Sequence, residues 1–251
     1  GDHLPTLGIL IGIFLGAIDA TVVGTSMPTI VARLKGIEVY FLVFSVFVIA
    51  QVVAMPLFGR YSDVYGRGRL HLLAVTVFVG GSMLCGLSAS MAQLILFRGV
   101  QGFGAGGLFA LSFTMIADLY PLEQRAKMQG AISGVWGIAA VAGPLAGGFI
   151  AEHWGWRWVF YVNVPFGVLS ALLVQAAWKE GDRHRAAKPD LAGVLFFAGA
   201  TAAFMTALAL AGRGGILWAS MLLGTCALLL AGLVWAERRI DHPFIPYDLY
   251  R

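Results

Sequence analysis

Runs of about twenty apolar residues follow one another along almost the whole chain, and they limit its fold more than any other feature. A helix needs about 20 mainly apolar residues to cross the hydrocarbon core of a bilayer. Eight such runs, separated by polar or turn-forming residues, lie at 7–28, 41–59, 70–88, 92–117, 129–151, 158–178, 191–211 and 216–236. The sequence therefore predicts an all-α membrane protein with eight spans.

The composition agrees with a chain that is surrounded by lipid. Of the 251 residues, 59% are hydrophobic and 12% are charged, whereas an ordinary globular domain carries about 25% charged residues. Small residues let helices approach closely in a bilayer, and the chain has 33 glycines. Cys85 and Cys226 both lie in apolar runs, which predicts no disulfide framework. Basic residues form no stripe with interleaved aromatic residues, so we expect no nucleic-acid partner.

The positively charged residues indicate the orientation of the spans. With a cytoplasmic N-terminus, twelve Lys and Arg residues fall in inner loops and four in outer loops, and Arg98 alone lies inside a span. The inner residues are Arg60, Arg67, Arg69, Arg125, Lys127, Lys179, Arg183, Arg185, Lys188, Arg238, Arg239 and Arg251, and the outer ones are Arg33, Lys35, Arg157 and Arg213. Because cytoplasmic loops carry the excess of Lys and Arg, this distribution predicts a cytoplasmic N-terminus.

Charged segments divide the chain into parts. Residues 179–190, KEGDRHRAAKPD, are the most charged segment and separate six predicted helices from two. The sequence therefore predicts a six-helix unit at 1–178, a cytoplasmic linker at 179–190, two additional spans at 191–236 and the start of a cytoplasmic loop at 237–251.

Two ionisable residues, Asp19 and Arg98, lie inside the predicted spans. An ionisable side chain there costs about 2.5–3.5 kcal/mol on insertion scales and is by default a functional hypothesis. Asp19 precedes Pro28, the predicted outer end of its helix, by nine residues, or about 13 Å. Arg98 lies about 10 Å from the outer start of its own helix, so we expect the two to share one cavity. Asp19 is then a candidate proton site, and a structural ion pair that joins two helices is the alternative.

The segment RGVQGFGAGG, residues 98–107, contains the spacing G-x-G-x-x-G at Gly102, Gly104 and Gly107. A dinucleotide-binding turn with this spacing follows a strand and opens a helix, but here the glycines lie within an unbroken apolar run. We therefore expect a smooth helix face for close packing. Its small residues fall at three- and four-residue steps: Gly99, Gly102, Gly106 and Ala110.

Two further motifs have a defined spacing. In GVWGIAAVAGPLAGG, Pro144 follows Gly143 and removes a backbone donor, which predicts a bend in the fifth helix. In the short inner loop GRYSDVYGRGR, Asp63 and Arg67 are four residues apart and Gly66 permits a turn. Close packing alone explains the glycines of the fifth helix, but it does not explain the Gly-Pro step.

Together these motifs resemble the major facilitator superfamily, and within it the drug:proton antiporters of the 14-span EmrB/QacA type. GRYSDVYGRGR is similar to the motif after helix two, LILFRGVQGFGAGG to the helix-four motif, and GVWGIAAVAGPLAGG to the antiporter motif of helix five. IDATVVGTSMPTI resembles the helix-one motif and WRWVFYVNVPFG the entry to helix six. The five motifs occur in the family's order. Val64 and Gly68 stand where many members carry basic residues.

This resemblance implies a fold and a set of residue roles. The expected fold is the six-helix N-terminal lobe of a transporter plus two additional transmembrane helices, in a bacterial inner membrane. A second six-helix lobe would follow, so the chain is expected to be a fragment that lacks its C-terminal lobe, and a natural half-size protein that dimerises is the alternative. The implied roles are proton coupling for Asp19 and Arg98, and conformational gating for Asp63, Arg67, Asp118, Gly143 and Pro144. Thr25, Gln51 and Gln101 are candidate polar contacts in the substrate cavity.

The expected function is proton-coupled export of hydrophobic or cationic small molecules, driven by the proton gradient without a cofactor. A transporter of a dedicated lipid, siderophore or peptide is the first alternative, and a structural membrane assembly domain is the second. Neither H-E-x-x-H nor G-x-S-x-G occurs in the sequence, and the histidines are scattered. We therefore expect no enzyme activity, no catalytic residue and no metal site.

Overall fold

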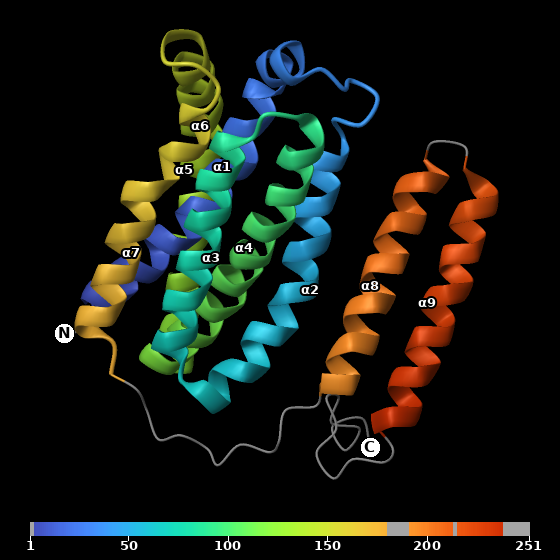
Figure 1. Cartoon of the computed structure of the whole chain (residues 1–251). Coiled ribbons are helices and arrows are strands. Elements are labelled where there is room, and N and C mark those ends of the chain that lie inside the picture. The colour runs from blue at the N-terminus through green and yellow to red at the C-terminus, as the bar shows by residue number, and fades with distance from the viewer. Residues whose placement is uncertain (1–2, 180–190, 213–214, 238–251) are drawn as a thin grey trace. The chain divides into compact units, whose positions relative to one another are not determined.

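The computed structural model describes residues 3–179, 191–212 and 215–237 (Figure 1). The chain divides into two compact units, residues 1–183 and residues 184–251. Apart from Lys179 and Glu237, the predicted linker and the predicted terminal loop lie outside the described residues.

Every described element is an α-helix, and the long helices of the first unit run in alternating directions (Figure 1). The first unit comprises α1 (His3–Leu34), α2 (Leu42–Tyr65), α3 (Arg67–Leu87), α4 (Met91–Leu119), α5 (Leu122–His153), α6 (Trp158–Tyr161) and α7 (Asn163–Ala177). We call the end of this unit at which α2 ends and α3 begins the Arg67 end, and the opposite end the Arg157 end.

The second unit contains two helices, α8 (Leu191–Ala211) and α9 (Ile216–Glu237), which pack around Ala200, Ala203 and Cys226. Within the described residues, seven helices are long and apolar enough to cross a membrane, counting α6 and α7 as the single stretch Trp158–Ala177. Of α8, Leu195–Ala211 counts as a shorter apolar helix. The predicted all-α membrane architecture is confirmed.

Two predicted helix limits were wrong. α1 does not end at Pro28 but continues to Leu34 with the proline inside it, and α5 begins at Leu122, well before residue 129. The span predicted at 158–178 agrees with the stretch Trp158–Ala177, within which Val162 separates α6 from α7. Pro165 explains this interruption, because a proline in the first turn of α7 has no amide with which to bond the carbonyl of Tyr161.

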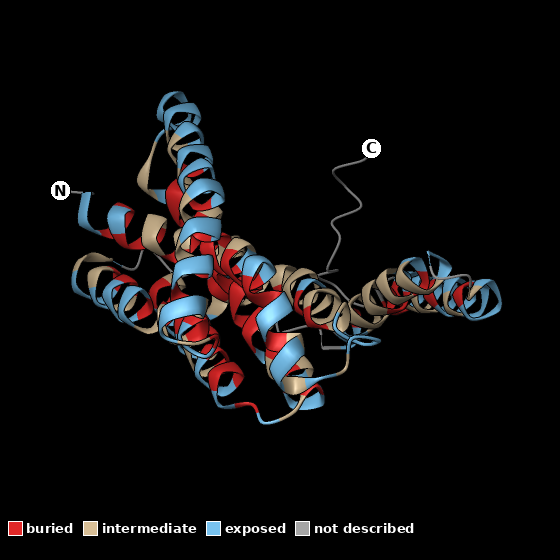
Figure 2. Ribbon diagram, turned by 90° about the horizontal axis from the view of Figure 1, so that it is seen from above, coloured by how far each residue is buried: buried red, intermediate tan, exposed pale blue. Residues whose placement is uncertain are grey.

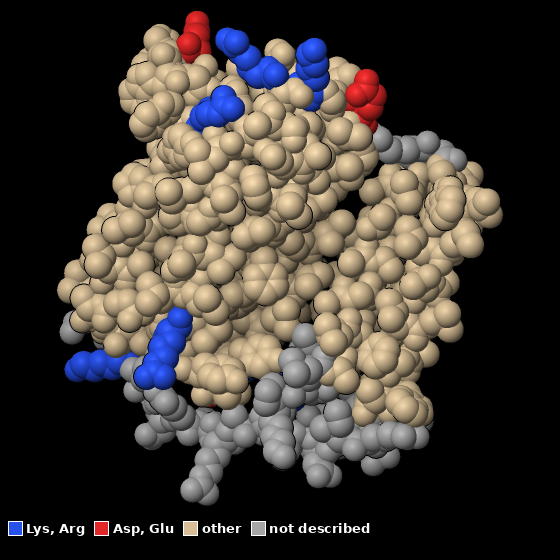
Figure 3. Space-filling model, viewed as in Figure 1, with Lys and Arg blue, Asp and Glu red and all other residues tan. Residues whose placement is uncertain are grey.

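The core of the first unit consists of two apolar clusters, and the buried residues lie where its helices meet (Figure 2). On α1, Ile9, Ile13 and Leu15 belong to the first cluster, whereas residues from Ala17 to Ile30 belong to the second. On the face shown in Figure 3, the charged side chains of this unit lie near its two ends. This distribution suits helices whose middle portions are in lipid.

Glycines of α4 bring this helix into backbone contact with its two neighbours. A methyl group on Gly102 or Gly106 would overlap a carbonyl oxygen of α2, that of Phe47 or that of Gln51, and a methyl group on Gly104 would overlap the Phe78 amide of α3. The stripe predicted from the sequence is therefore a packing surface, and its glycines lie inside a continuous helix.

Candidate functional site

Asp19 of α1 and Arg98 of α4 form an ion pair inside the first unit. The Arg98 Nη1 atom donates to the Asp19 Oδ2 atom at 2.5 Å, and each residue is about 1% exposed. The sequence placed the two at equal depth by measuring from Pro28, which is not the end of α1. The two side chains pair all the same.

Two neutral amides complete the surroundings of the Asp19 carboxylate. Gln101 donates from Nε2 to the Asp19 Oδ1 atom at 2.7 Å, and Asn163 donates from Nδ2 to the same oxygen at 3.1 Å. With the guanidinium of Arg98, three donors converge on one carboxylate. This arrangement suits the ionised form, because an ionised carboxylate accepts hydrogen bonds and donates none.

Arg98 has partners besides the carboxylate. Its Nη1 atom also donates to the Gln101 Oε1 atom at 2.7 Å, and its Nε atom donates to the Val43 carbonyl at 3.3 Å. The guanidinium carbon lies 4.0 Å from the centre of the Phe47 ring, within the range of a cation–π interaction. The cation is therefore held by three groups that do not depend on the charge of Asp19.

Ser82 connects this network to α3. Its hydroxyl donates to the Phe160 carbonyl at 2.8 Å and accepts from Gln101 at 3.1 Å and from Asn163 at 3.0 Å. The Cys85 thiol lies 3.6 Å from the Gln101 Oε1 atom. Sequence reasoning missed Ser82 and Asn163. The signal that marks both is a polar side chain inside a predicted span.

The three residues predicted to contact substrate are in different surroundings. Gln101 is fully buried, and both ends of its amide are bonded within the network. Thr25 is exposed, and its hydroxyl donates to the Val22 carbonyl within α1 at 3.0 Å. Gln51 lines a cavity of about 10 Å³ together with Trp136 of α5. The structure therefore brings Gln101 to Asp19, apart from any open cavity.

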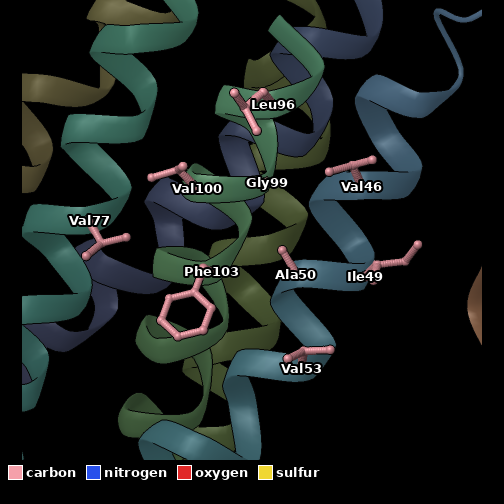
Figure 4. Close-up of a pocket in the computed structure, with 9 residues that line it drawn as sticks. All are labelled: Val46, Ile49, Ala50, Val53, Val77, Leu96, Gly99, Val100 and Phe103. Carbon is pink, nitrogen blue, oxygen red and sulfur yellow. The ribbon is translucent and has the colours of Figure 1, made fainter. Parts of the chain in front are cut away.

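A larger cavity, of about 570 Å³, lies along α2 and α4 (Figure 4). All nine of its lining residues are apolar: Val46, Ile49, Ala50, Val53, Val77, Leu96, Gly99, Val100 and Phe103. Binding sites for small molecules combine an apolar lining with a few polar groups that fix orientation. Without such groups, this cavity suits only an apolar occupant.

The charges predicted to gate the transporter meet at the Arg67 end. The Arg67 Nη2 atom lies 3.2 Å from the Asp63 Oδ1 atom, and its Nη1 atom pairs with Asp118 of α4. Arg67 also donates to the Thr114 carbonyl of α4 at 2.7 Å. This guanidinium therefore connects the turn between α2 and α3 to the last turns of α4.

Gly143 and Pro144 lie where α5 packs on α1. A methyl group on Gly143 would overlap the Thr21 hydroxyl, which donates across the interface to the Ala139 carbonyl at 3.1 Å. Pro144 is inside α5, which remains one helix from Leu122 to His153. The Gly-Pro step therefore lies at a close contact between two helices.

Comparison with known proteins gives consistent matches. Residues 9–236 match the family model of the Major Facilitator Superfamily. The chain is 37% identical to Multidrug resistance protein 3 of Bacillus subtilis over 248 residues, which are 98% of the chain and 48% of that relative. It is 35% identical to Efflux pump dotC of Dothistroma septosporum, covering 99% of the chain and 44% of the pump. The chain thus spans about half the length of these relatives.

Solved structures support the same fold. An auto-inhibited POT family peptide transporter matches 94% of the chain and 53% of its own length, with a TM-score of 0.63 and 14% identity. A bacterial homologue of the human lysosomal transporter Spinster matches 92% of the chain and 60% of its own length, with a TM-score of 0.56 and 21% identity. The match to the family model and the identities together show that this multi-pass integral membrane protein belongs to the Major Facilitator Superfamily.

Proposed function

We propose that this chain is the N-terminal lobe of a proton-coupled exporter of hydrophobic or cationic small molecules, with Asp19 as its proton site. One observation carries the proposal: a carboxylate that is about 1% exposed pairs with a buried guanidinium inside a membrane-spanning bundle. An ionisable residue within a membrane-spanning segment is by default a candidate for a proton or substrate pathway. The names of the relatives, a multidrug resistance protein and an efflux pump, support export.

The geometry supports a specific role for Arg98 in this cycle. Proton binding removes the charge of Asp19 and weakens its pair with the guanidinium. Arg98 then keeps its bonds to the Gln101 amide and the Val43 carbonyl and its contact with the Phe47 ring. Protonation therefore leaves no bare buried cation. The contact between α1 and α4 is free to loosen while Arg98 stays in place.

We also propose two helix contacts, one at Arg67 and one between α1 and α5, as the places where the lobe changes conformation. The Arg67 group connects the turn between α2 and α3 to the end of α4, and its release would let this end of the lobe move. Gly143 and Pro144 lie where α5 packs on α1. We propose that α5 slides on α1 at this contact, because a helix face with glycine resists sliding less than a face with branched side chains.

Transport by this scheme requires a second lobe. Substrate sites of such transporters lie between the two halves of the molecule, and the chain spans about half of its relatives. We therefore propose that the substrate site is completed by a C-terminal lobe of the same parent protein, in a bacterial inner membrane with the N-terminus in the cytoplasm. Thr25 and Gln51 are proposed as polar contacts on this lobe's wall of that site.

Export of a fluorescent cationic dye from cells that make the two-lobed transporter tests this function. We expect energised cells to expel the dye and a protonophore to stop the export, because the proton gradient supplies the free energy. Cells with a vector lacking the gene are the control. A dye that is retained with the gradient intact contradicts multidrug export. Transport of a lipid, siderophore or peptide in its place would support the dedicated-substrate alternative, and the absence of any transport would support an assembly domain.

Loss of the Arg67 contacts is expected to have a smaller effect on dye export. We expect Arg67→Ala to lower dye export several-fold, because surface ion pairs are worth only about 0–1 kcal/mol each, and this change removes two of them and a hydrogen bond to the Thr114 carbonyl. Arg69→Ala is the matched control, since Arg69 is an exposed arginine two residues away on the same helix. Equal export by the two variants would argue against a gating role for Arg67.

A further inference from the structure

Buried side-chain atoms without a hydrogen-bond partner occur along α7 and at its contact with α3. Among the described residues there are three such atoms: His71 Nδ1, Asn163 Oδ1 and Trp178 Nε1. Asn163 is the first residue of α7, and Trp178 directly follows its last residue. The third residue, His71 of α3, contacts Ser170 of α7. All three therefore belong to the seam where α7 packs on α1 and α3, which we call the α7 seam.

The hydrogen bonds around His71 show which kind of partner its Nδ1 atom lacks. Ser170 donates its hydroxyl proton to the Gly8 carbonyl at 2.7 Å. Its bond with the His71 Nε2 atom, at 3.2 Å, therefore requires the imidazole to be the donor. The Nδ1 atom is then an acceptor without a donor, on a residue that is 0% exposed. Leaving such a group unsatisfied is costly, and buried water is the usual partner.

Asn163, which contacts Asp19, also has a buried acceptor without a donor. Its Nδ2 atom donates to Asp19 and to Ser82, whereas its Oδ1 atom has no donor and the residue is 1% exposed. Ser170 follows Asn163 by seven residues on α7, a distance of about 10 Å along the helix. Three or four water molecules in single file cover this distance at about 2.8 Å per hydrogen bond.

One glycine makes the intervening part of the seam narrow and apolar. Gly167 lies between Asn163 and Ser170 on the buried face of α7. A methyl group there would overlap the Val79 side chain and would lie 3.5 Å from Val75. The obstruction is thus a side chain of α3 and not backbone, and Val79 is half-buried. A side chain can rotate about its own bonds without any movement of a helix.

We propose that the α7 seam holds a file of water molecules that conducts protons between the Arg67 end and Asp19, with Val79 as its gate. The protonated Asp19 carboxyl breaks its O–H bond and gives the proton to the water next to Asn163, which passes a proton along the file and leaves Asp19 as a carboxylate. The route lies on a different face of α1 from Thr21, which contacts α5. The proton therefore leaves Asp19 without crossing the face that carries Thr25. The direction of proton transfer rests on the proposed function, whereas the presence of water in the α7 seam does not.

X-ray-generated hydroxyl radicals, which modify side chains next to bound water, test the hydration directly. We expect His71 in the purified protein in lipid nanodiscs to be modified about tenfold faster than Phe78, because both are 0% exposed but only His71 has an atom that needs water. Phe78 is the matched control, an aromatic residue of the same helix. Equal, slow modification of both would overturn the proposal.

Transport by variants separates this inference from the proposed function. In the two-lobed transporter, we expect His71→Leu to slow proton-driven dye export about tenfold, because one anchor of the water file is lost, while dye binding stays unchanged. Phe78→Leu, an aromatic-to-leucine change at an equally buried site of α3, is expected to export normally. If Asp19→Asn abolishes coupling but His71→Leu exports as Phe78→Leu does, the water path is wrong and the proton site stands. Full proton coupling of export in Asp19→Asn would reject Asp19 as the proton site. The hydroxyl-radical experiment would still decide whether the α7 seam holds water.

Discussion

Replacing Asp19 by asparagine is expected to reduce proton-driven export in the two-lobed transporter by about 100-fold or more. The reason is that asparagine cannot bind and release a proton within the membrane-spanning bundle. Asparagine retains the size of aspartate and can still accept hydrogen bonds from Gln101 and Asn163. We therefore expect the variant to reach the membrane in normal amounts. Dye export from energised vesicles, normalised to the amount of transporter in the membrane, measures the effect.

A double variant distinguishes a proton site from a structural ion pair. Asp19→Asn alone leaves Arg98 without its counter-ion, and breaking a buried pair in this way costs about 3–5 kcal/mol. The contacts of Arg98 with Gln101, Val43 and Phe47 are expected to reduce this loss. Adding Arg98→Gln removes the unpaired charge, and we expect it to restore thermal stability but not export. Recovery of export in the double variant would show that the pair only joins α1 to α4.

Replacing Gly106 by alanine is expected to give a large loss of stability. The added methyl group would overlap the Gln51 carbonyl oxygen and would lie 2.8 Å from the Ala54 side chain, both on α2. A backbone atom is fixed by the rest of its helix, so α2 and α4 must separate. Overpacking of a core costs about 1–3 kcal/mol, occasionally more, and we expect the upper end of this range. The unfolding temperature of the purified protein measures it.

Gly80→Ala is the matched control for this change. No atom lies within 4 Å of the position where the new methyl group would be, and Gly80 lies in the interior of α3. Alanine is favoured over glycine within a helix by about 1 kcal/mol, so we expect equal or slightly higher stability. Similar unfolding temperatures for Gly106→Ala and Gly80→Ala would contradict the close contact between α2 and α4.

The sequence predicted the membrane architecture and the two residues at the centre of the site. Runs of apolar residues are set by the thickness of the bilayer, so they are visible without any knowledge of packing. Asp19 and Arg98 are visible for the same reason, because a charge within such a run is costly and rare. The antiporter-like motifs supplied the family, which the comparisons confirmed.

Helix limits and neutral polar partners were less accessible from the sequence. Pro28 lies inside α1, and Pro165 interrupts what was predicted as one span. A proline limits a helix only where the carbonyl it leaves unbonded finds no other partner, and neighbouring helices supply such partners in a membrane. The effect of each proline therefore depends on contacts that the linear sequence does not contain.

By itself, the sequence determined that this chain spans a membrane, that glycines line one face of α4, and that a carboxylate and a guanidinium lie at membrane depth. Only the tertiary structure decided that Gln101, Asn163 and Ser82 surround the Asp19 carboxylate, and that His71 lies in the α7 seam. The physical reason is that hydropathy depends on each residue's own transfer free energy. Hydrogen bonds between helices depend on how each helix is rotated and crossed against its neighbours, and that is fixed by the packing of all of them together.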